Sequence, residues 1–184
     1  MSPRFYSALT GAVLGTVIGA WIDVAVLKPP PLLIWNASAS APIGLYWLHS
    51  GRPSVASKMV AVTPPTALAA FMAGRHYLPQ GVLLLKHVAA LPGARVCRFG
   101  TVVTISGKAA AVARATDTRD RPLPVWRGCR VVGRDEVFLL NAAPDSFDGR
   151  YFGPLPARTV IGQATPLYTD EAGNGRFVWR AATR

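Results

Sequence analysis

Hydrophobic residues form one long run near the start of the chain and many short runs after it. Residues 5–22 carry no charged side chain, and only Asp23 interrupts the apolar run before Lys28. About 20 apolar residues are needed to cross a bilayer, so this run predicts a transmembrane helix. Arg4 precedes it, which places the N-terminus in the cytoplasm and the rest of the chain outside. A cleavable signal peptide is the alternative, although Ile18-Gly19-Ala20 is a weak cleavage site.

The short apolar runs that follow are typical of β-strands separated by turns. Prolines 29–31 end the helix. Strands are predicted at residues 32–35, 45–48, 55–62, 81–88, 95–97, 101–105, 109–114, 129–132, 137–141 and 159–168. A helix is predicted at 67–75, after a proline pair, and a surface loop at 116–127. The pattern predicts a mainly β (α+β) fold, with 1–28 as a membrane anchor or signal segment and 29–184 as one domain.

Net charge raises the question of a nucleic-acid partner. The chain carries 20 basic and 9 acidic residues in 184, a net charge of +11. Arginines are scattered from Arg52 to Arg184, however, and no nucleic-acid motif occurs. Attraction to anionic lipid headgroups, or solubility, explains the charge more simply. We therefore expect a membrane partner rather than a nucleic acid.

Two cysteines, Cys97 and Cys129, are the only thiols in the sequence. Neither has a Cys or His partner at metal-ligand spacing, and no metal or cofactor is expected. In an oxidising periplasm the two cysteines would pair. In a cytosolic protein they would be two inert core thiols.

Residues 36–48 place two serines, Ser38 and Ser40, just ahead of Pro42 and Gly44. Serine, proline and glycine are common turn residues, so a turn is the simplest interpretation of this stretch. A serine hydroxyl becomes a nucleophile only when a nearby base removes its proton. The choice between a turn and a catalytic loop therefore depends on a base elsewhere in the chain.

Lys86 is the best candidate for that base. It follows the apolar residues 82–85, and burial favours the neutral form of a lysine, which can accept a proton. The alternative is a lysine that extends its charged end to solvent from an edge strand. His49 and His76 fall beside a turn and at a helix end, and His87 would point to the opposite face from Lys86. A Ser/His/Asp triad is therefore not supported.

Three ordered blocks resemble the signal peptidase I superfamily, most closely its TraF-type members, the peptidases of bacterial conjugative transfer. The blocks are Ser40-Ala-Pro-Ile-Gly-Leu-Tyr46, Lys86-His-Val-Ala-Ala-Leu-Pro-Gly93 and Asp145-Ser-Phe-Asp-Gly-Arg-Tyr-Phe-Gly153. The resemblance implies a largely antiparallel β domain of the signal peptidase I type, with one N-terminal transmembrane helix and no cofactor.

The resemblance also implies roles for individual residues. Ser40 falls at the position of the nucleophile and Lys86 at that of the general base. Ser38 falls where a hydroxyl helps the backbone amide of the nucleophile to hold the oxyanion. Ser146 falls where a hydroxyl orients the lysine. Asp148 and Arg150 match an acidic and basic pair that supports the site.

Departures from ordinary signal peptidases favour the TraF-type branch. Pro42 follows Ser40 by two positions where those enzymes have Ser-Met-x-Pro, and Lys86-His87 replaces Lys-Arg. The expected function is a membrane-anchored serine endopeptidase that processes a conjugative pilin, with closure of the pilin into a ring as a further implication. It would lie in the bacterial inner membrane, with the catalytic domain in the periplasm beside other transfer proteins. The alternatives are a general signal peptidase and a non-catalytic pilus-assembly module.

Overall fold

The computed structural model describes residues 3–27, 32–51, 56 and 58–181, which fall into two units, Met1–Pro31 and Leu32–Arg184. The first unit contains helix α1 (Pro3–Leu27), so the structure confirms a helix in the predicted place. Within the described ranges, no helix has both the length and the apolar character that a membrane crossing requires. The transmembrane span therefore stays a prediction.

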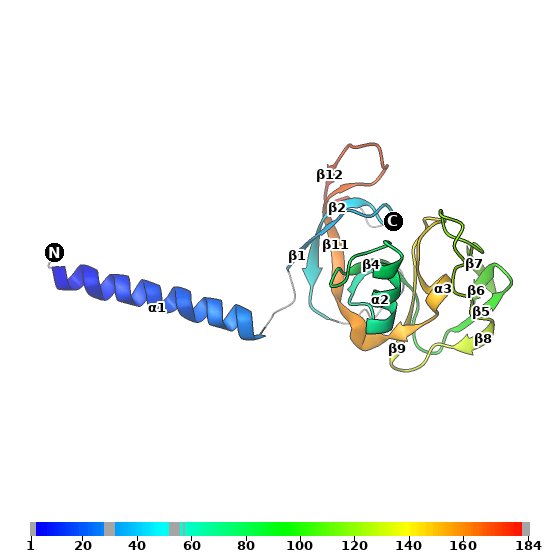
Figure 1. Ribbon diagram of the computed structural model, residues 1–184, viewed down its shortest axis with the longest axis horizontal. Helices are drawn as coiled ribbons and strands as arrows, with labels where there is room; N and C mark the ends of the chain where they lie inside the picture. The colour runs from blue at the N-terminus through cyan, green and yellow to red at the C-terminus, as the bar shows by residue number, and fades with distance from the viewer. Residues whose placement is uncertain (1–2, 28–31, 52–55, 57, 182–184) are drawn as a thin grey trace. The chain divides into compact units, whose positions relative to one another are not determined.

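A sheet of eight strands forms most of the second unit, in the order β1-β2-β11-β3-β4-β9-β10, with β12 added to β11 (Figure 1). Its strands are β1 (Leu33–Asn36), β2 (Ile43–His49), β3 (Met59–Val62), β4 (Leu84–Ala90), β9 (Glu136–Leu140), β10 (Leu155–Pro156), β11 (Val160–Asp170) and β12 (Val178–Trp179). All its pairs are antiparallel. Strand β11 pairs with β2, β3 and β12, so it joins the two halves of the sheet.

A smaller sheet has the order β7-β6-β5-β8. Its strands are β5 (Arg95–Phe99), β6 (Val102–Ile105), β7 (Lys108–Val112) and β8 (Gly128–Val131). A tight hairpin turn joins β6 to β7, where Ser106 and Gly107 both have positive φ, 50° and 80°. Two positive φ angles match the twist of a tight hairpin. Cys97 and Cys129 face each other across β5 and β8 and form the predicted disulfide.

Three short helices complete the described part of the second unit. Helix α2 (Thr66–Gly74) confirms the predicted helix, and its Met72 packs with Val60, Val88 and Leu139 of the larger sheet. Helix α3 (Gly149–Phe152) and the 3-10 helix η1 (Ala157–Thr159) are too short for a periodic pattern to reveal them. The predicted strands are found within a few residues of their expected ends, except that part of 55–62 lies outside the described residues.

Gly44 sets how closely β2 approaches β11. Its φ is +145°, an angle that L side chains rarely adopt. A Cβ at this position would lie 2.2 Å from the carbonyl oxygen of Tyr168 and 2.7 Å from the Cα of Thr169. Glycine therefore lets the strand that follows the serine stretch lie directly against β11.

Candidate active site

The loop between β1 and β2 carries both serines and is folded around one asparagine. Asn36 Nδ2 donates hydrogen bonds to the carbonyls of Ser38, Ala41 and Pro42 at 2.9, 3.0 and 3.0 Å. Its Oδ1 accepts from the backbone N–H of Ser38 at 3.1 Å. This arrangement holds the hydroxyls of Ser38 and Ser40 3.0 Å apart. The predicted turn is thus present, and it brings the two hydroxyls together.

Lys86 lies in β4 with only 2% of its surface exposed. Its Nζ is 2.8 Å from Ser146 Oγ and 3.4 Å from Ser40 Oγ, although Ser40 precedes it by 46 residues. Burial lowers the pKa of Lys86 from its ordinary 10.5 to about 8, although the negative charge of Asp148 opposes the shift. A neutral amine beside a serine hydroxyl can act as its general base. The structure does not support a lysine that reaches out to solvent.

Asp148 and Arg150 form a buried ion pair, exposed by 0% and 2%. Arg150 Nε lies 2.8 Å from Asp148 Oδ1, and Arg150 Nη2 lies 3.1 Å from Asp148 Oδ2. Both side chains also bind the backbone of Asn141, Arg150 donating to its carbonyl at 2.7 Å and Asp148 accepting from its N–H at 3.0 Å. The pair therefore fixes the backbone at the end of β9, as expected of residues that support the site.

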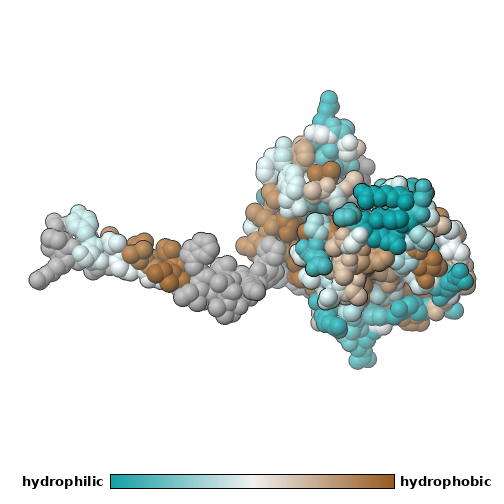
Figure 2. Space-filling view, viewed as in Figure 1, coloured by the Kyte–Doolittle hydropathy of each residue, from teal (hydrophilic) through white to brown (hydrophobic). Residues whose placement is uncertain are grey.

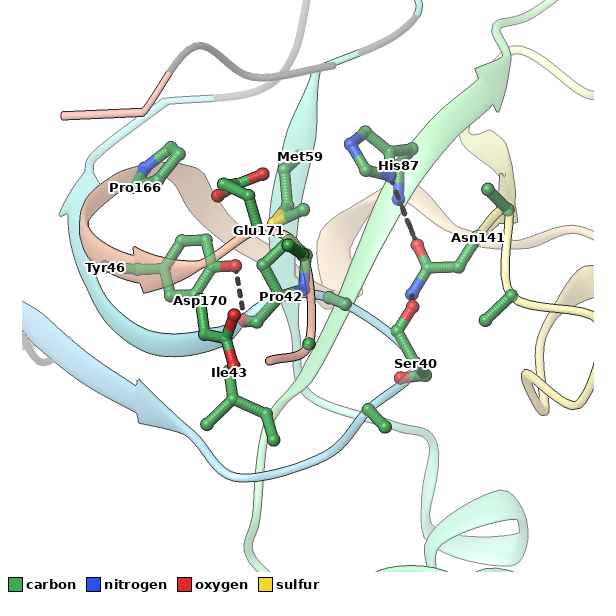
Figure 3. A pocket seen from close by; sticks show the side chains of 16 residues that line it. Ser40, Pro42, Ile43, Tyr46, Met59, His87, Asn141, Pro166, Asp170 and Glu171 are labelled. Atoms are coloured by element: carbon green, nitrogen blue, oxygen red, sulfur yellow. Dashed lines mark hydrogen bonds between the residues drawn. The ribbon is translucent and has the colours of Figure 1, made fainter. Parts of the chain in front are cut away.

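Asn141 is a residue of the site that sequence reasoning missed. Its Nδ2 donates to the carbonyls of Ser40 at 2.7 Å and Leu85 at 3.0 Å, and its Oδ1 accepts from the backbone N–H of His87 at 3.1 Å (Figure 3). One amide thus links the serine loop to the strand that carries Lys86. The only sequence signal is a polar residue directly after the apolar run 137–140.

The orientation of the Asn141 amide also determines which tautomer of a neutral His87 can bond to it. The carbonyls of Ser40 and Leu85 can only accept hydrogen bonds, so the NH₂ group of Asn141 must face them. The other end of the amide, Oδ1, then lies 3.3 Å from His87 Nδ1. A neutral His87 must then carry its proton on Nδ1 to make this hydrogen bond. Its Nε2 is buried and has no partner among the described residues. His49 and His76 line none of the cavities that reach Ser40.

Three cavities meet at Ser40. The lysine cavity, about 260 Å³, is lined by Ser38, Ser40, Lys86, Tyr77, Asp117 and Asp145 among others. The strand cavity, about 510 Å³, lies between Ile34–Ser38 and Val82–Leu85. The acidic cavity, about 370 Å³, is lined by 39–43, Tyr46, His87, Asn141 and the turn that begins at Asp170 (Figure 3). Lys86 and His87 therefore face different cavities, as their alternation along β4 predicts.

Apolar surface gathers beside the strand cavity. Trp35 of β1 is 58% exposed, and Leu32 and Leu33 are also exposed. Figure 2 shows brown, hydrophobic atoms on the side of the second unit where Figure 1 draws β1.

Within the described residues, no group of three or more His, Cys, Asp or Glu side chains could hold a metal ion.

A serine and a buried, partly neutral lysine on an antiparallel β domain have the layout of a serine–lysine hydrolase, and the sequence agrees with this class. The profile described as "Signal peptidase, peptidase S26" matches residues 6–169. This range includes Ser40, Lys86 and the 145–153 block. The chain belongs to the signal peptidase family S26.

Relatives of the chain carry names from conjugation. The chain is 31% identical over 173 residues to "Probable conjugal transfer protein TraF" of Sinorhizobium fredii. The aligned residues cover 89% of this chain and 87% of the relative. It is 34% identical over 144 residues to "Conjugal transfer protein TraF" of Agrobacterium fabrum, with 73% and 81% covered. A "Plasmid transfer protein TraF" of Escherichia coli is 29% identical, also with 73% and 81% covered.

A signal peptidase I from Enterococcus faecalis is among the solved structures that resemble the chain. It is 18% identical, with a TM-score of 0.37, and the match covers 62% of this chain and 98% of that one. A TM-score this low supports no comparison of individual positions.

Proposed function

We propose that the chain is a serine endopeptidase of conjugative transfer that processes a pilin or a related exported protein. The observation that carries the proposal is the placement of Lys86 Nζ, buried, 3.4 Å from Ser40 Oγ and 2.8 Å from Ser146 Oγ. The names of the relatives supply the biological context of conjugation.

In the proposed mechanism, neutral Lys86 takes the proton from Ser40 as its hydroxyl attacks the substrate carbonyl. Ser38 Oγ, 3.0 Å from Ser40 Oγ, and the backbone N–H of Ser40 stabilise the oxyanion. Lys86 then gives its proton to the leaving amine, and an acyl ester on Ser40 remains. Ser146 holds Nζ in position throughout.

The strand cavity would hold the acyl half of the substrate in an extended form. Strand β1 is first in the order of its sheet, so one of its edges has no partner strand among the described residues. Leu84 and Leu85 pair with β3, whereas β9 joins β4 only from His87 onward. Two open edges around one cavity can bind a peptide through its main chain.

Ring closure of the pilin is the finer part of the proposal. The acyl ester on Ser40 can be taken by water or by an amine. If the pilin's own N-terminus lies beside the ester, its effective concentration exceeds that of a free amine by several orders of magnitude. Lys86 is neutral again after the first step and would take the proton of the incoming amine.

The proposed location is the periplasmic face of the bacterial inner membrane. The uncharged residues 5–22 after Arg4 support attachment at the membrane. Fractionation of cells that produce the full chain tests this, since the protein should remain with the membranes after a high-salt wash. Recovery of the full chain in the wash would contradict it.

The decisive experiment is mass spectrometry of a candidate pilin produced together with the enzyme. Wild-type enzyme should shorten the pilin, Ser40→Ala should leave it intact, and Ser50→Ala, an exposed serine outside the site, should behave as wild type. A product one water lighter than the cleaved linear chain identifies the ring, and only the linear mass would eliminate ring closure. Processing that survives Ser40→Ala in a folded protein would reject the peptidase and favour an assembly module.

A further inference from the structure

The acidic cavity differs in charge from the rest of the protein. The chain has a net charge of +11, yet no lysine or arginine lines this cavity, whereas Asp170 and Glu171 both do. Figure 3 shows the two carboxylates on the side of the cavity opposite His87 and Asn141, with Ser40 at its edge. A locally negative cavity that opens at the nucleophile favours a cationic ligand.

The two carboxylates have different tasks. Asp170 is 6% exposed, and its oxygens accept from the backbone N–H groups of Asn174 at 3.1 Å and Gly175 at 2.7 Å, so it shapes the turn. Glu171 Oε1 accepts from Thr169 Oγ1 at 2.6 Å. Its Oε2 accepts no hydrogen bond from the described part of the chain. Glu171 is therefore the carboxylate that can meet a ligand.

Glu171 is also close to the serine loop. The hydroxyl of Tyr46 donates to the carbonyl of Pro42 at 2.7 Å, and Pro42 is two residues after Ser40. Burial raises the pKa of Tyr46, and the negative charge of Glu171 raises it further. Glu171 thus acts electrostatically on a group that is bonded to the loop of the nucleophile.

The position of Ser40 divides a bound polypeptide between two cavities. Ser40 lines both the strand cavity and the acidic cavity, so a chain whose carbonyl lies at Ser40 extends into both. The acyl half must stay bound through the ester intermediate, and the strand cavity offers main-chain pairing for it. The acidic cavity is lined by a turn and by loop 141–143 rather than by open strand edges. It therefore suits the amine half of the substrate, which must leave after the acyl ester forms.

We propose that the acidic cavity binds the segment that follows the scissile bond, and that Glu171 selects a basic side chain in that segment. This proposal rests on the peptidase function proposed above. A charge-assisted hydrogen bond at a partly exposed site predicts a preference of about 5-fold to 10-fold for lysine over alanine. Screening by salt should reduce this preference.

The test is a series of peptide substrates that differ only after the scissile bond. Each carries Lys, Ala or Glu at one of the first three positions after the bond, and a second series carries the same changes before it. We expect wild-type kcat/KM to rank Lys above Ala above Glu in the first series at one position at least, and the ranking to be absent from the second series. Equal rates for all three residues after the bond would overturn the proposal without affecting the peptidase function.

Variants assign the preference to a residue. Glu171→Gln keeps an oxygen for Thr169 but removes the charge, so the ratio of rates for Lys and Ala should fall toward one. Asp135→Asn removes one charge from an exposed position that lines none of the three cavities, and it should keep the wild-type ratio. A ratio that survives in folded Glu171→Gln would reject Glu171 as the selecting group.

A binding measurement separates this proposal from the peptidase function. If no peptide is cleaved, the peptidase assignment fails. Binding to the acidic cavity is then measured by the fluorescence anisotropy of the same peptides carrying a fluorophore. Tighter binding of the Lys peptide to Ser40→Ala, lost in the double variant with Glu171→Gln, would support the cavity. Equal binding of the Lys and Ala peptides would overturn it.

Discussion

The region around Ser40 and the smaller sheet are stabilised by different kinds of bond. Around Ser40 the core contains an ammonium-bearing side chain, an ion pair and an amide, all joined by hydrogen bonds. The smaller sheet contains one covalent crosslink, Cys97–Cys129, between directly paired strands. Buried polar groups are costly unless every partner is present, whereas a disulfide acts mainly on the unfolded chain. Loss of a hydrogen bond around Ser40 should therefore affect activity, and loss of the crosslink in the smaller sheet should affect stability alone.

Lys86→Arg is expected to have the largest effect. A guanidinium stays charged and cannot accept the proton of Ser40, so kcat/KM should fall by at least about 10³-fold. Hydrolysis of a cleavable peptide measures the loss, and Lys108→Arg, at an exposed position in β7, is the matched control. An active Lys86→Arg enzyme would remove lysine from the mechanism.

Asp148→Ala should break the buried ion pair and leave Arg150 without its partner. Breaking such a pair costs about 3–5 kcal/mol of the free energy of unfolding. It also frees the backbone of Asn141, so activity should fall even at temperatures where the protein stays folded. Urea unfolding gives the first quantity. A loss of stability below about 1 kcal/mol would show that the pair is not needed to hold the fold.

Replacement of both Cys97 and Cys129 by alanine should lower stability by about 3–4 kcal/mol, the value expected for a closed loop of this size. No residue of the proposed mechanism lies in the smaller sheet, so kcat/KM at low temperature should stay near that of the wild type. Thermal unfolding and peptide hydrolysis measure the two effects. A large loss of activity in the folded variant would show that the two regions are coupled.

The pH profile follows from the pKa of Lys86, about 8. The base is active only after it loses its proton, so kcat/KM should rise about 50-fold between pH 6 and pH 8, and only about twofold more before it levels off above the pKa. Initial rates across this range, with stability checked at each pH, measure the profile. A profile that is flat from pH 6 to pH 9 would contradict a lysine base.

Lys86→Met should give the smallest change in stability of these variants, and in the direction of greater stability. Below about pH 8 the lysine is protonated in both the folded and unfolded chain, and the folded protein bears the cost of a buried charge. Between about pH 8 and 10.5 the unfolded chain binds more protons, so the stability of the wild type rises with pH. The variant should be about 2 kcal/mol more stable at pH 6, after the lost hydrogen bond to Ser146, and the difference should shrink toward pH 10. A constant difference would show that charge is not the cause.

Much of the site could be predicted because its residues lie in short motifs with fixed spacing. The three blocks that resemble the signal peptidases contain Ser40, Lys86 and Ser146, with Ser38 two residues before the first block, and the structure brings the four side chains together. The strands were predicted because alternation and turn residues are local signals as well. Roles inferred from the resemblance agree with these positions, and activity measurements on the variants will test them.

Asn141 and Glu171 could not be predicted, because their importance depends on distant partners. Asn141 meets the carbonyl of Ser40 across 101 residues of sequence, and nothing near Asn141 indicates this contact. Glu171 is one acidic residue in a turn, and only the pairing of β11 with β2 carries it to the serine loop. Both are consequences of sheet order, which a single sequence does not determine.

Deamidation of Asn141 would disturb the site without changing any group that reacts. Hydrolysis of that amide to a carboxylate would keep almost the same shape, but it would remove the N–H groups that bind Ser40 and Leu85. The new negative charge would then face two carbonyl oxygens in a buried place. A stored preparation could therefore lose its nucleophile geometry while every residue that performs chemistry stays intact. The geometry of the nucleophile thus depends on the N–H groups of a side chain that takes no part in the reaction.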